Sequence, residues 1–343
     1  MKNQKHIAII GAGIAGMETA IQLTRAGYKT TLLEKEKSTG GYLSHWSYLF
    51  PDFSDPKEVV SQLSSSLNNH NIKTITNTEI TEIEKSNGHF VLKAKNELNV
   101  NADAVVVTSG FQIFDATRKE EYGYGLFDNV ITSADLEKMI RQKKPVKTKA
   151  GKTPRRIAII HCVGSRDAKS GNTYCSKVCC ITGIKQAIEL NKMLPESEIF
   201  CFYMDLRLYG SKFDDLYLKA QKHHKIQFIR GRLSEASEKT DKSLQIKAED
   251  TLSGRPLRMD VDIIVLLVGM EPGVSNENFS QKKFLELDDN GFLKSENMHT
   301  ARNYTTQPGV FMAGTCICPM SVNETLENAR SAAMKVINYF EKA

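Results

Sequence analysis

Four of the seven cysteines in this 343-residue chain gather in one short stretch, residues 155–194. They are Cys162, Cys175, Cys179 and Cys180, and their spacing is C-x12-C-x3-C-C. A 4Fe–4S cluster takes one thiolate at each of its irons, so it needs a set of this kind. Structural zinc sites usually show two short C-x2–4-C pairs, which are absent from this stretch. We therefore expect these four cysteines to ligate a 4Fe–4S cluster, with zinc ligation and unligated buried thiols as the alternatives.

The elements around these cysteines form a strand–turn–helix pattern. Ile157–His161 is an apolar run typical of a buried strand, and apolar residues recur at roughly helical spacing from Val178 to Leu190. In a dinucleotide-binding unit a glycine-rich turn would lie between them, but here the turn His161–Arg166 keeps only Gly164. Without those glycines the backbone cannot approach a pyrophosphate closely. The sequence thus predicts a βαβ unit that has lost its nucleotide and holds cysteines instead.

A second pattern, G-x-G-x-x-G, lies near the N-terminus. It follows the apolar run Ile7–Ile10, precedes a helical segment at Met17–Ala26, and is followed by an acid at the end of the next strand. In this setting the helix N-terminus binds the pyrophosphate of a dinucleotide, and an acid about 20 residues onward accepts hydrogen bonds from the ribose. The residues expected to bind the adenosine half are Gly11, Ala12, Gly13, Ile14, Ala15, Gly16, Glu34 and Lys35.

Composition and charge limit the class of protein. With 41% hydrophobic and 25% charged residues, the chain has the composition of a globular protein of about two domains. Seven cysteines without a secretory signal indicate a reducing compartment, so we expect a cytoplasmic protein. The longest apolar run, Ile263–Val268, is too short to span a membrane. Much of the net charge of +6 lies in residues 143–156, as either a solvated linker or a surface for an acidic partner, and we expect no nucleic-acid partner.

Other motifs resemble the FAD-dependent pyridine-nucleotide disulfide oxidoreductases. In that family a double glycine follows the acid, as Gly40 and Gly41 follow Glu34 here, and a terminal flavin motif is similar to residues 309–315. Thr315 stands where the family usually has an aspartate. The resemblance implies that the flavin contacts include Gly40, Gly41, Tyr42, Leu43, Ile80, Ser109, Gly110, Gly314, Thr315, Met320, Ser321 and Val322.

The same resemblance implies an α/β fold with two dinucleotide-binding, Rossmann-like domains, the second inserted into the first. Residues 1–115 and 265–343 are then the FAD-binding domain. Residues 116–264 form the inserted domain, which carries the 4Fe–4S cluster.

Taken whole, the chain resembles the family of A-type subunits of heterodisulfide reductase (the HdrA family). The matching segments are GAGIAG, GGYLSHWSYLFP, CVGSRD, YCSKVCC, MDLRLYG and the helix start after Pro319. The chain lacks the cysteines that should follow Phe50-Pro51 in methanogenic members, and it has no inserted ferredoxin-like domain. It is therefore more similar to the short A-type subunits in heterodisulfide reductase-like complexes of sulfur oxidisers, with the related subunit of quinone-interacting membrane-associated oxidoreductases as the alternative.

This resemblance implies an electron-transfer subunit with FAD and one 4Fe–4S cluster, which takes part in sulfur metabolism. It further implies a homodimer that works with B and C type subunits and with a lipoate-binding protein system. Two other functions stay open at this point. One is an NAD(P)H-dependent FAD oxidoreductase with a structural zinc, and the other is a flavin-bound scaffold subunit.

Lys185 is the residue expected to act directly on the flavin. At about 100° per residue it is rotated by roughly 140° from Cys180 around the helix, so the two side chains point to different sides. The family carries a lysine at this distance after the paired cysteines, which implies that Lys185 lies close to flavin N5. The alternative is an ordinary solvated lysine on a helix surface.

Overall fold

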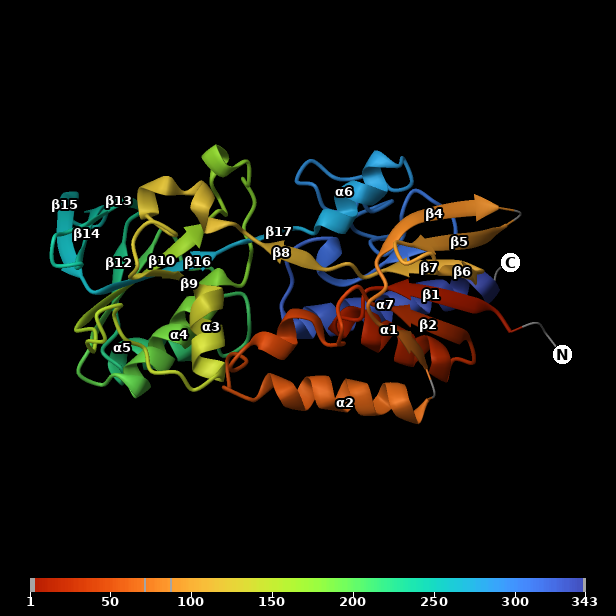
Figure 1. The fold of residues 1–343 in the computed structure, drawn as a ribbon, viewed down its shortest axis with the longest axis horizontal. Helices are drawn as coiled ribbons and strands as arrows, with labels where there is room; N and C mark the ends of the chain where they lie inside the picture. The colour runs from red at the N-terminus through yellow and green to blue at the C-terminus, as the bar shows by residue number, and fades with distance from the viewer. Residues whose placement is uncertain (1–3, 71, 87, 342–343) are drawn as a thin grey trace. The chain divides into compact units, whose positions relative to one another are not determined.

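The computed structural model describes residues 4–70, 72–86 and 88–341. Residues 1–3 and 342–343, the outermost parts of the predicted FAD-binding domain, lie outside them. The chain forms two compact units, drawn in Figure 1. Unit 1 comprises Met1–Ser44, Pro56–Gln112 and Glu271–Ala343, and unit 2 comprises His45–Asp55 and Ile113–Met270. The segment 45–55, which the sequence placed in the first domain, thus packs with the second unit.

Unit 1 is built on a five-stranded parallel sheet with the order β18-β7-β1-β2-β3. The strands are β18 (Val310–Met312), β7 (Ala104–Val107), β1 (His6–Ile10), β2 (Lys29–Leu33) and β3 (Lys73–Ile75). The helices are α1 (Ile14–Arg25), α2 (Pro56–Asn69), α6 (Val274–Gln281) and α7 (Val322–Glu341). A second, antiparallel sheet contains β4 (Ile80–Ser86), β5 (His89–Ala94) and β6 (Asn99–Ala102).

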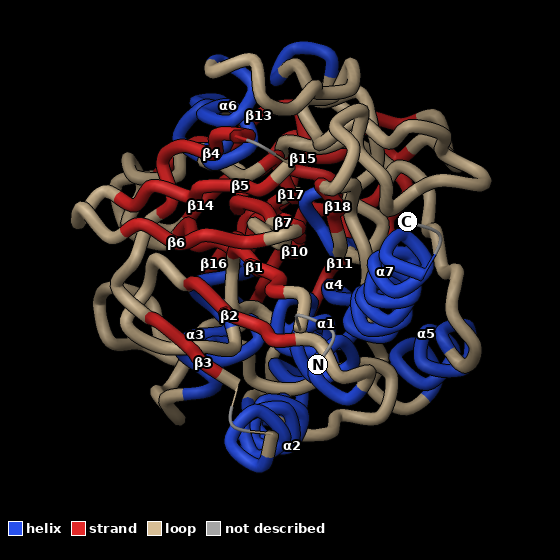
Figure 2. The backbone as a smooth tube through the Cα atoms, turned by 90° about the vertical axis from the view of Figure 1, so that its right-hand side faces the viewer, coloured by secondary structure: helices blue, strands red, loops and turns tan. Residues whose placement is uncertain are grey.

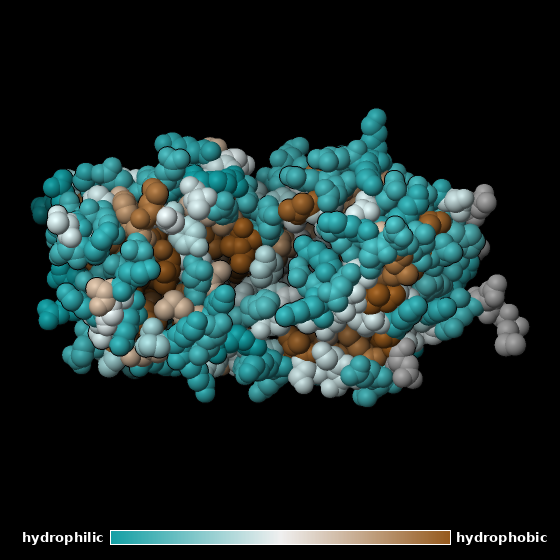
Figure 3. Space-filling model, viewed as in Figure 1, coloured by the Kyte–Doolittle hydropathy of each residue, from teal (hydrophilic) through white to brown (hydrophobic). Residues whose placement is uncertain are grey.

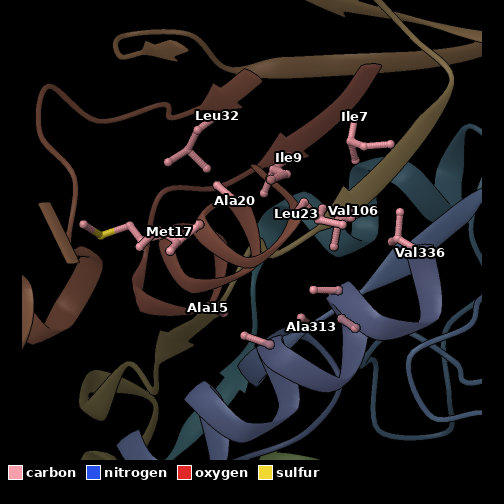
Figure 4. Packing of buried hydrophobic residues seen from close by; sticks show 14 of the residues in the cluster. Ile7, Ile9, Ala15, Met17, Ala20, Leu23, Leu32, Val106, Ala313 and Val336 are labelled. Atoms are coloured by element: carbon pink, nitrogen blue, oxygen red, sulfur yellow. The ribbon is translucent and has the colours of Figure 1, made fainter. Parts of the chain in front are cut away.

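Both faces of the central sheet in unit 1 are covered, which explains its continuous apolar strands. On one face Ile7 and Ile9 pack with buried residues of α1, α2 and α7, and Figure 4 shows this core. On the other face Ala8 and Ile10 pack with residues of β4, β5 and α6. Because alternate residues of a strand point to opposite faces, a strand covered on both sides must be apolar throughout.

Unit 2 repeats this plan with a parallel sheet of order β12-β11-β10-β16-β9. Its strands are β12 (Gln227–Arg230), β11 (Glu198–Tyr203), β10 (Arg156–Val163), β16 (Ile263–Val268) and β9 (Val130–Thr132). Three helices pack into the core on one face: α3 (Ser133–Arg141), α4 (Cys179–Met193) and α5 (Phe213–Lys222). The other face is covered by the antiparallel sheet β13 (Leu233–Glu238), β14 (Leu244–Asp250) and β15 (Arg255–Val261).

The strands that connect the units complete the fold. The chain leaves unit 1 at β8 (Phe111–Ile113) and returns at β17 (Met270–Pro272), and these two strands pair with each other. Figure 2 shows the strands in red and the helices in blue. The strand expected at Ile157–His161 runs on to Val163.

The molecular surface is mostly polar. Figure 3 shows hydrophilic residues over most of the visible face, with smaller apolar areas among them. The most exposed large apolar side chains are those of Leu126, Leu252 and Met298, each 71% exposed. In the part of the chain that the structure describes, every helix is too short or too polar to cross a lipid bilayer.

Candidate functional site

The glycine turn of unit 1 has the shape that a dinucleotide requires. A Cβ atom on Gly16 would stand 1.9 Å from the carbonyl oxygen of Gly11, and one on Gly11 would stand 2.4 Å from that of Thr108. Gly11 also has a φ of +105°, which only glycine adopts readily. At Gly13, in contrast, a Cβ would meet nothing within 4 Å. The turn is therefore closely packed on the protein side and open at Gly13, where α1 begins.

Glu34 is held beside this turn by the backbone. Its buried carboxylate accepts hydrogen bonds from the backbone N–H groups of Ala12, at 2.6 Å, and Glu36, at 2.9 Å. Each carboxylate oxygen keeps a further lone pair for a ribose hydroxyl. The double glycine also reaches the turn, because Gly40 forms a β-bridge with Gly13 and donates its N–H to Ala12 O at 2.8 Å.

The remaining predicted flavin contacts come from several elements of unit 1. Gly110 has a φ of +75°, and a Cβ there would lie 3.9 Å from Thr315 Oγ1, so these two residues face each other. Ser109 donates to Asn276 at 2.9 Å. Gly314 donates its N–H to the Asn328 side chain at 2.9 Å. The other predicted contacts are buried Leu43, Ile80 and Met320, partly buried Ile14, Ser321 and Val322, and exposed Lys35 and Tyr42.

The start of α7 has its own cap. The Ser321 N–H donates to the Glu324 carboxylate at 2.9 Å, so one helix-terminal donor is already satisfied. Glu324 also adds negative charge at this helix start.

The four cysteines lie where β10 ends and α4 begins. Cys162 is near the end of β10 with a φ of +61°, and Cys179 and Cys180 open α4. Cys175 precedes the helix and is partly exposed, whereas the other three are buried. Helix α4 begins at Cys179, next to Val178, where the helical spacing of apolar residues starts. No acidic residue lies in its first turn, so its positive end faces these sulfurs without a competing carboxylate.

The sulfurs are close enough to affect one another's ionisation. Burial, then the neighbouring Cys180 and Cys175 sulfurs, raise the pKa of Cys162 to about 12, while the Arg166 charge opposes this rise. Burial and the other three thiols raise the pKa of Cys179 well above its usual value. Four thiolates together are thus unfavourable unless a cationic metal centre binds them.

Donors around the sulfurs suit a negatively charged cluster. The backbone N–H of Lys177 donates to Cys175 Sγ at 3.3 Å, and that of Arg207 donates to Cys180 Sγ at 3.5 Å. Arg166 binds Asp205 through Nη2 at 2.7 Å, while its buried Nη1 has no hydrogen-bond partner among the described residues.

By chemical type, four thiols with nearby N–H donors suit a 4Fe–4S cluster. Across residues 4–70, 72–86 and 88–341, no three His, Cys, Asp or Glu side chains are arranged to hold a metal ion. The four-cysteine ligand set stays a prediction.

Unit 2 leaves no open backbone at its own turn. Gly164, the one glycine kept there, has a φ of +69°, and a Cβ on it would lie 2.1 Å from the Phe114 ring. Phe114 is 2% exposed, so a packed aromatic side chain fills the space that is empty at Gly13 in unit 1. Asp167 anchors the following loop through Lys119, at 2.8 Å, and Arg232, at 2.9 Å.

Lys185 is buried at 2% exposure, which excludes the alternative of a solvated surface lysine. Its Nζ lies 2.5 Å from Glu137 Oε1 and 3.4 Å from Glu189 Oε2. It also donates to Tyr48 O at 3.1 Å and to Ser47 Oγ at 3.3 Å. All of these groups belong to unit 2. The proximity of Lys185 to flavin N5 stays a prediction.

Sequence reasoning missed the partners of both sites. Thr108 closes the glycine turn by donating to Ile10 O at 2.9 Å and to Gly11 O at 2.8 Å. Glu137 and Glu189 flank Lys185. Glu137 follows Thr132 and Asp135, which form a capping box at the start of α3, and this was the one local signal that marked its helix.

Comparison with known proteins bears on the family and the fold of the chain. The model of the pyridine nucleotide-disulphide oxidoreductase family matches residues 5–335. The iron-sulfur A-type subunit of the CoB–CoM heterodisulfide reductase of Methanocaldococcus jannaschii is 29% identical over 97% of this chain and 64% of its own length. The A-type subunit of the H2/formate:CoB-CoM heterodisulfide,ferredoxin reductase of Methanococcus maripaludis gives the same three figures. The chain thus spans slightly less than two thirds of the length of these relatives.

Solved structures agree on the fold. Thioredoxin reductase of Lactococcus lactis has a TM-score of 0.70 at 16% identity and covers 99% of this chain and 100% of its own. Thioredoxin reductase of T. acidophilum has a TM-score of 0.68 at 18% identity and covers 99% of each chain. The predicted fold class, with two Rossmann-like units, is confirmed.

Proposed function

This chain belongs to the pyridine nucleotide-disulphide oxidoreductase family, and we propose that it is an electron-transfer subunit of a heterodisulfide reductase-like complex. In this proposal unit 1 binds FAD and unit 2 binds one 4Fe–4S cluster. The flavoprotein assignment is supported by the family and by the relatives named as A-type subunits of heterodisulfide reductases.

The contrast between the two glycine turns carries the proposal. The turn of unit 1 is open at Gly13, next to the Glu34 carboxylate. The turn of unit 2 is filled by Phe114, and the four cysteines, whose sulfurs interact, lie within it and after it. A chain with one open nucleotide turn and one turn that holds thiols is suited to one dinucleotide and one metal cluster.

The residues of the chain then have distinct tasks. Gly11, Gly13 and Gly16 bring the backbone to the pyrophosphate, and Glu34 accepts hydrogen bonds from the ribose. Cys162, Cys175, Cys179 and Cys180 ligate the cluster, and Lys185 places a buried positive charge on the same helix. When bound, the flavin supplies two-electron chemistry that it can exchange with one-electron carriers.

The finer assignments belong to the same proposal. We infer that the protein takes part in sulfur metabolism, in the type of complex found in sulfur oxidisers. It then works as a cytoplasmic homodimer with B and C type subunits and with a lipoate-binding protein system. The absence of cysteines after Phe50-Pro51, where methanogenic members should carry them, is the sequence feature that favours this subtype.

Anaerobic purification tests the cofactors. We expect one FAD per chain, four irons and four acid-labile sulfides, and a broad absorbance beneath the flavin bands. Cys179→Ala should lose the iron and sulfide but keep the FAD. The matched control is Cys201→Ala, because Cys201 is a buried cysteine of β11 outside the predicted set. Stoichiometric zinc in place of iron would refute the cluster, and loss of iron in the control alone would refute the predicted ligand set.

A further inference from the structure

A buried group of charges in unit 2 contains more acid than its single cation can pair. Lys185, Glu137 and Glu189 are each at most 6% exposed. Glu137 comes from α3, and the other two lie one turn apart on α4. Ser47 and Tyr48, from the segment 45–55, complete the group. One ammonium thus faces two carboxyl groups away from water, where an unpaired charge is costly.

Glu137 receives almost all of the available hydrogen bonds. Its Oε2 accepts from Ser47 Oγ at 2.6 Å and from Ser47 N at 2.8 Å. Its Oε1 accepts from Lys185 at 2.5 Å and from Gln186 Nε2 at 2.8 Å. Burial alone would raise the pKa of Glu137, but the Lys185 charge and these hydrogen bonds outweigh it, so the pKa is lowered. Glu137 is therefore the ionised partner of Lys185.

Glu189 receives only the weaker share of these donors, with Ser47 Oγ at 3.2 Å from its Oε1 and Lys185 Nζ at 3.4 Å from its Oε2. The three N–H bonds of Lys185 are directed at Glu137, Tyr48 O and Ser47 Oγ. The single hydroxyl hydrogen of Ser47 goes to Glu137, 2.6 Å away, rather than to Glu189 Oε1 at 3.2 Å. Glu189 Oε2 has no hydrogen-bond partner among the described residues. A proton on Glu189 Oε1 would remove the poorly compensated charge, because the carboxylic acid O–H can then donate to Ser47 Oγ.

We propose that Glu189 is a proton-binding site, and that it exchanges one proton with solvent as the charge around Lys185 changes. With the proton bound, a chain of hydrogen bonds runs from Glu189 through Ser47 to ionised Glu137, and the group is neutral. Without the proton, the group carries one net negative charge.

Electrostatics agrees with this arrangement. Burial is the largest cause and raises the pKa of Glu189. The Lys185 charge lowers this pKa, the Glu137 charge raises it, and weaker hydrogen bonds from Lys185 and Ser47 lower it, so that the pKa of Glu189 is raised to about 7. The groups facing Glu189 are thus Lys185 from its own helix, Glu137 from α3, and Ser47 from the segment 45–55. A site that is half-protonated near neutral pH can respond to a single added charge.

The redox consequence rests on the proposed function, whereas the proton site itself does not. If Lys185 faces the flavin, one electron from a low-potential donor adds one negative charge near it. Uptake of one proton from water by ionised Glu189 then leaves the net charge of the region unchanged.

Infrared difference titration of the holoprotein from about pH 5 to pH 9 tests the proton site. We expect the carbonyl band of a buried protonated carboxylic acid to disappear with a midpoint near 7. Glu189→Gln, which has nearly the same shape, should abolish the band. Glu137→Gln should lower the midpoint by at least about one pH unit, because Glu189 then becomes the only carboxylate beside Lys185.

Glu18→Gln is the matched control. Glu18 is equally buried but lies in unit 1, where it pairs with Arg330 at 2.6 Å. The band should be unaffected by this change. A band that survives Glu189→Gln, or a midpoint that rises in Glu137→Gln, would overturn the proposal. If Glu189→Gln fails to fold, the midpoint measured in Glu137→Gln still tests the proposal.

A reductive titration then separates this proposal from the proposed function. Protons taken up per electron, followed with a pH indicator in weak buffer at about pH 8, should fall in Glu189→Gln and stay unchanged in Glu18→Gln. Equal uptake in wild type and Glu189→Gln would refute the redox link. A chain that binds no FAD would refute the proposed function, while the infrared titration would still report on Glu189.

Discussion

At the scale of single residues, the ionisation of the buried groups around Lys185 depends on how many hydrogen-bond donors each of them receives. Lys185 was correctly placed on the cysteine helix from its spacing, but its burial was not foreseen. Its partners Ser47 and Glu137 lie 138 and 48 residues away in sequence. Helical periodicity reports which side of a helix a residue faces, and it carries no information about what packs there. The sequence therefore predicted the lysine and missed the two acids.

The stability of the protein should depend on pH through Glu189. Its pKa is raised from 4.5 to about 7 in the folded protein. The folded state therefore binds the proton more tightly than the unfolded state, and this contribution to stability is complete below about pH 4.5 and lost as the pH rises through 7. Glu189→Gln keeps a neutral group at every pH, so it should be more stable than wild type at pH 8, by about 1–3 kcal/mol.

Urea unfolding at pH 5 and pH 8 provides the measurement. The gain of Glu189→Gln over wild type should be clear at about pH 8 and small at about pH 5. The control Glu18→Gln should show no such gain at the higher pH, because it breaks an ion pair with Arg330. An equal difference between Glu189→Gln and wild type at both pH values would contradict the prediction.

At the scale of elements, apolar patterns in the sequence identify the strands and helices that are buried and miss those that are short or mostly exposed. Strands β1, β10 and β16 are buried on both faces, so their continuous apolar runs identified them in the sequence. Helix α2 was missed because only three of its fourteen residues are buried. Strand β9 has three residues and pairs with β16 at the edge of its sheet. Short elements of this kind depend on tertiary contacts that the local sequence does not encode.

The glycine turn of unit 1 gives a prediction that separates folding from binding. Gly16→Ala should destabilise the protein strongly, because the new Cβ would overlap the Gly11 backbone at 1.9 Å. Gly13→Ala should fold as well as wild type, since Gly13 has a φ of −69° and open space around it. It should nevertheless bind FAD at least about tenfold more weakly, because the methyl group would occupy the path of the pyrophosphate.

Thermal unfolding of the apoproteins and titration with FAD would measure the two effects. The expected result is a lowered Tm for Gly16→Ala alone and a raised Kd for Gly13→Ala. Full FAD affinity in Gly13→Ala would place the dinucleotide elsewhere than at this turn.

At the scale of the whole molecule, the proposed cofactors fix how many electrons the chain stores. A flavin takes two electrons and a 4Fe–4S cluster takes one, so anaerobic titration should consume about three electrons per chain. Cys179→Ala should consume about two, and Cys201→Ala should match wild type. A wild-type protein that takes up two electrons would be a flavoprotein without a redox-active cluster.

The two Rossmann-like units also differ in whether their turns can accept a dinucleotide. This difference predicts how the chain reacts with nicotinamide nucleotides. A dinucleotide needs glycine backbone that it can approach, and unit 2 offers only Gly164, which is covered by the Phe114 ring. The buried Asp167 anchor and the Arg166–Asp205 ion pair hold the rest of that turn in place. We therefore expect NADH and NADPH to reduce the bound flavin slowly and without saturation.

Stopped-flow mixing of the oxidised holoprotein with either nucleotide would test this expectation, with dithionite as the positive control for a reducible flavin. Phe114→Ala is the informative variant. It should clear the space above Gly164 while leaving the cysteines in place, so slow reduction in this variant as well would show that the missing glycines are sufficient to exclude the nucleotide. Rapid, saturable reduction of the wild-type flavin would instead mean that unit 2 binds a nicotinamide nucleotide despite its filled turn, and the chain would then be an NAD(P)H-dependent flavoenzyme.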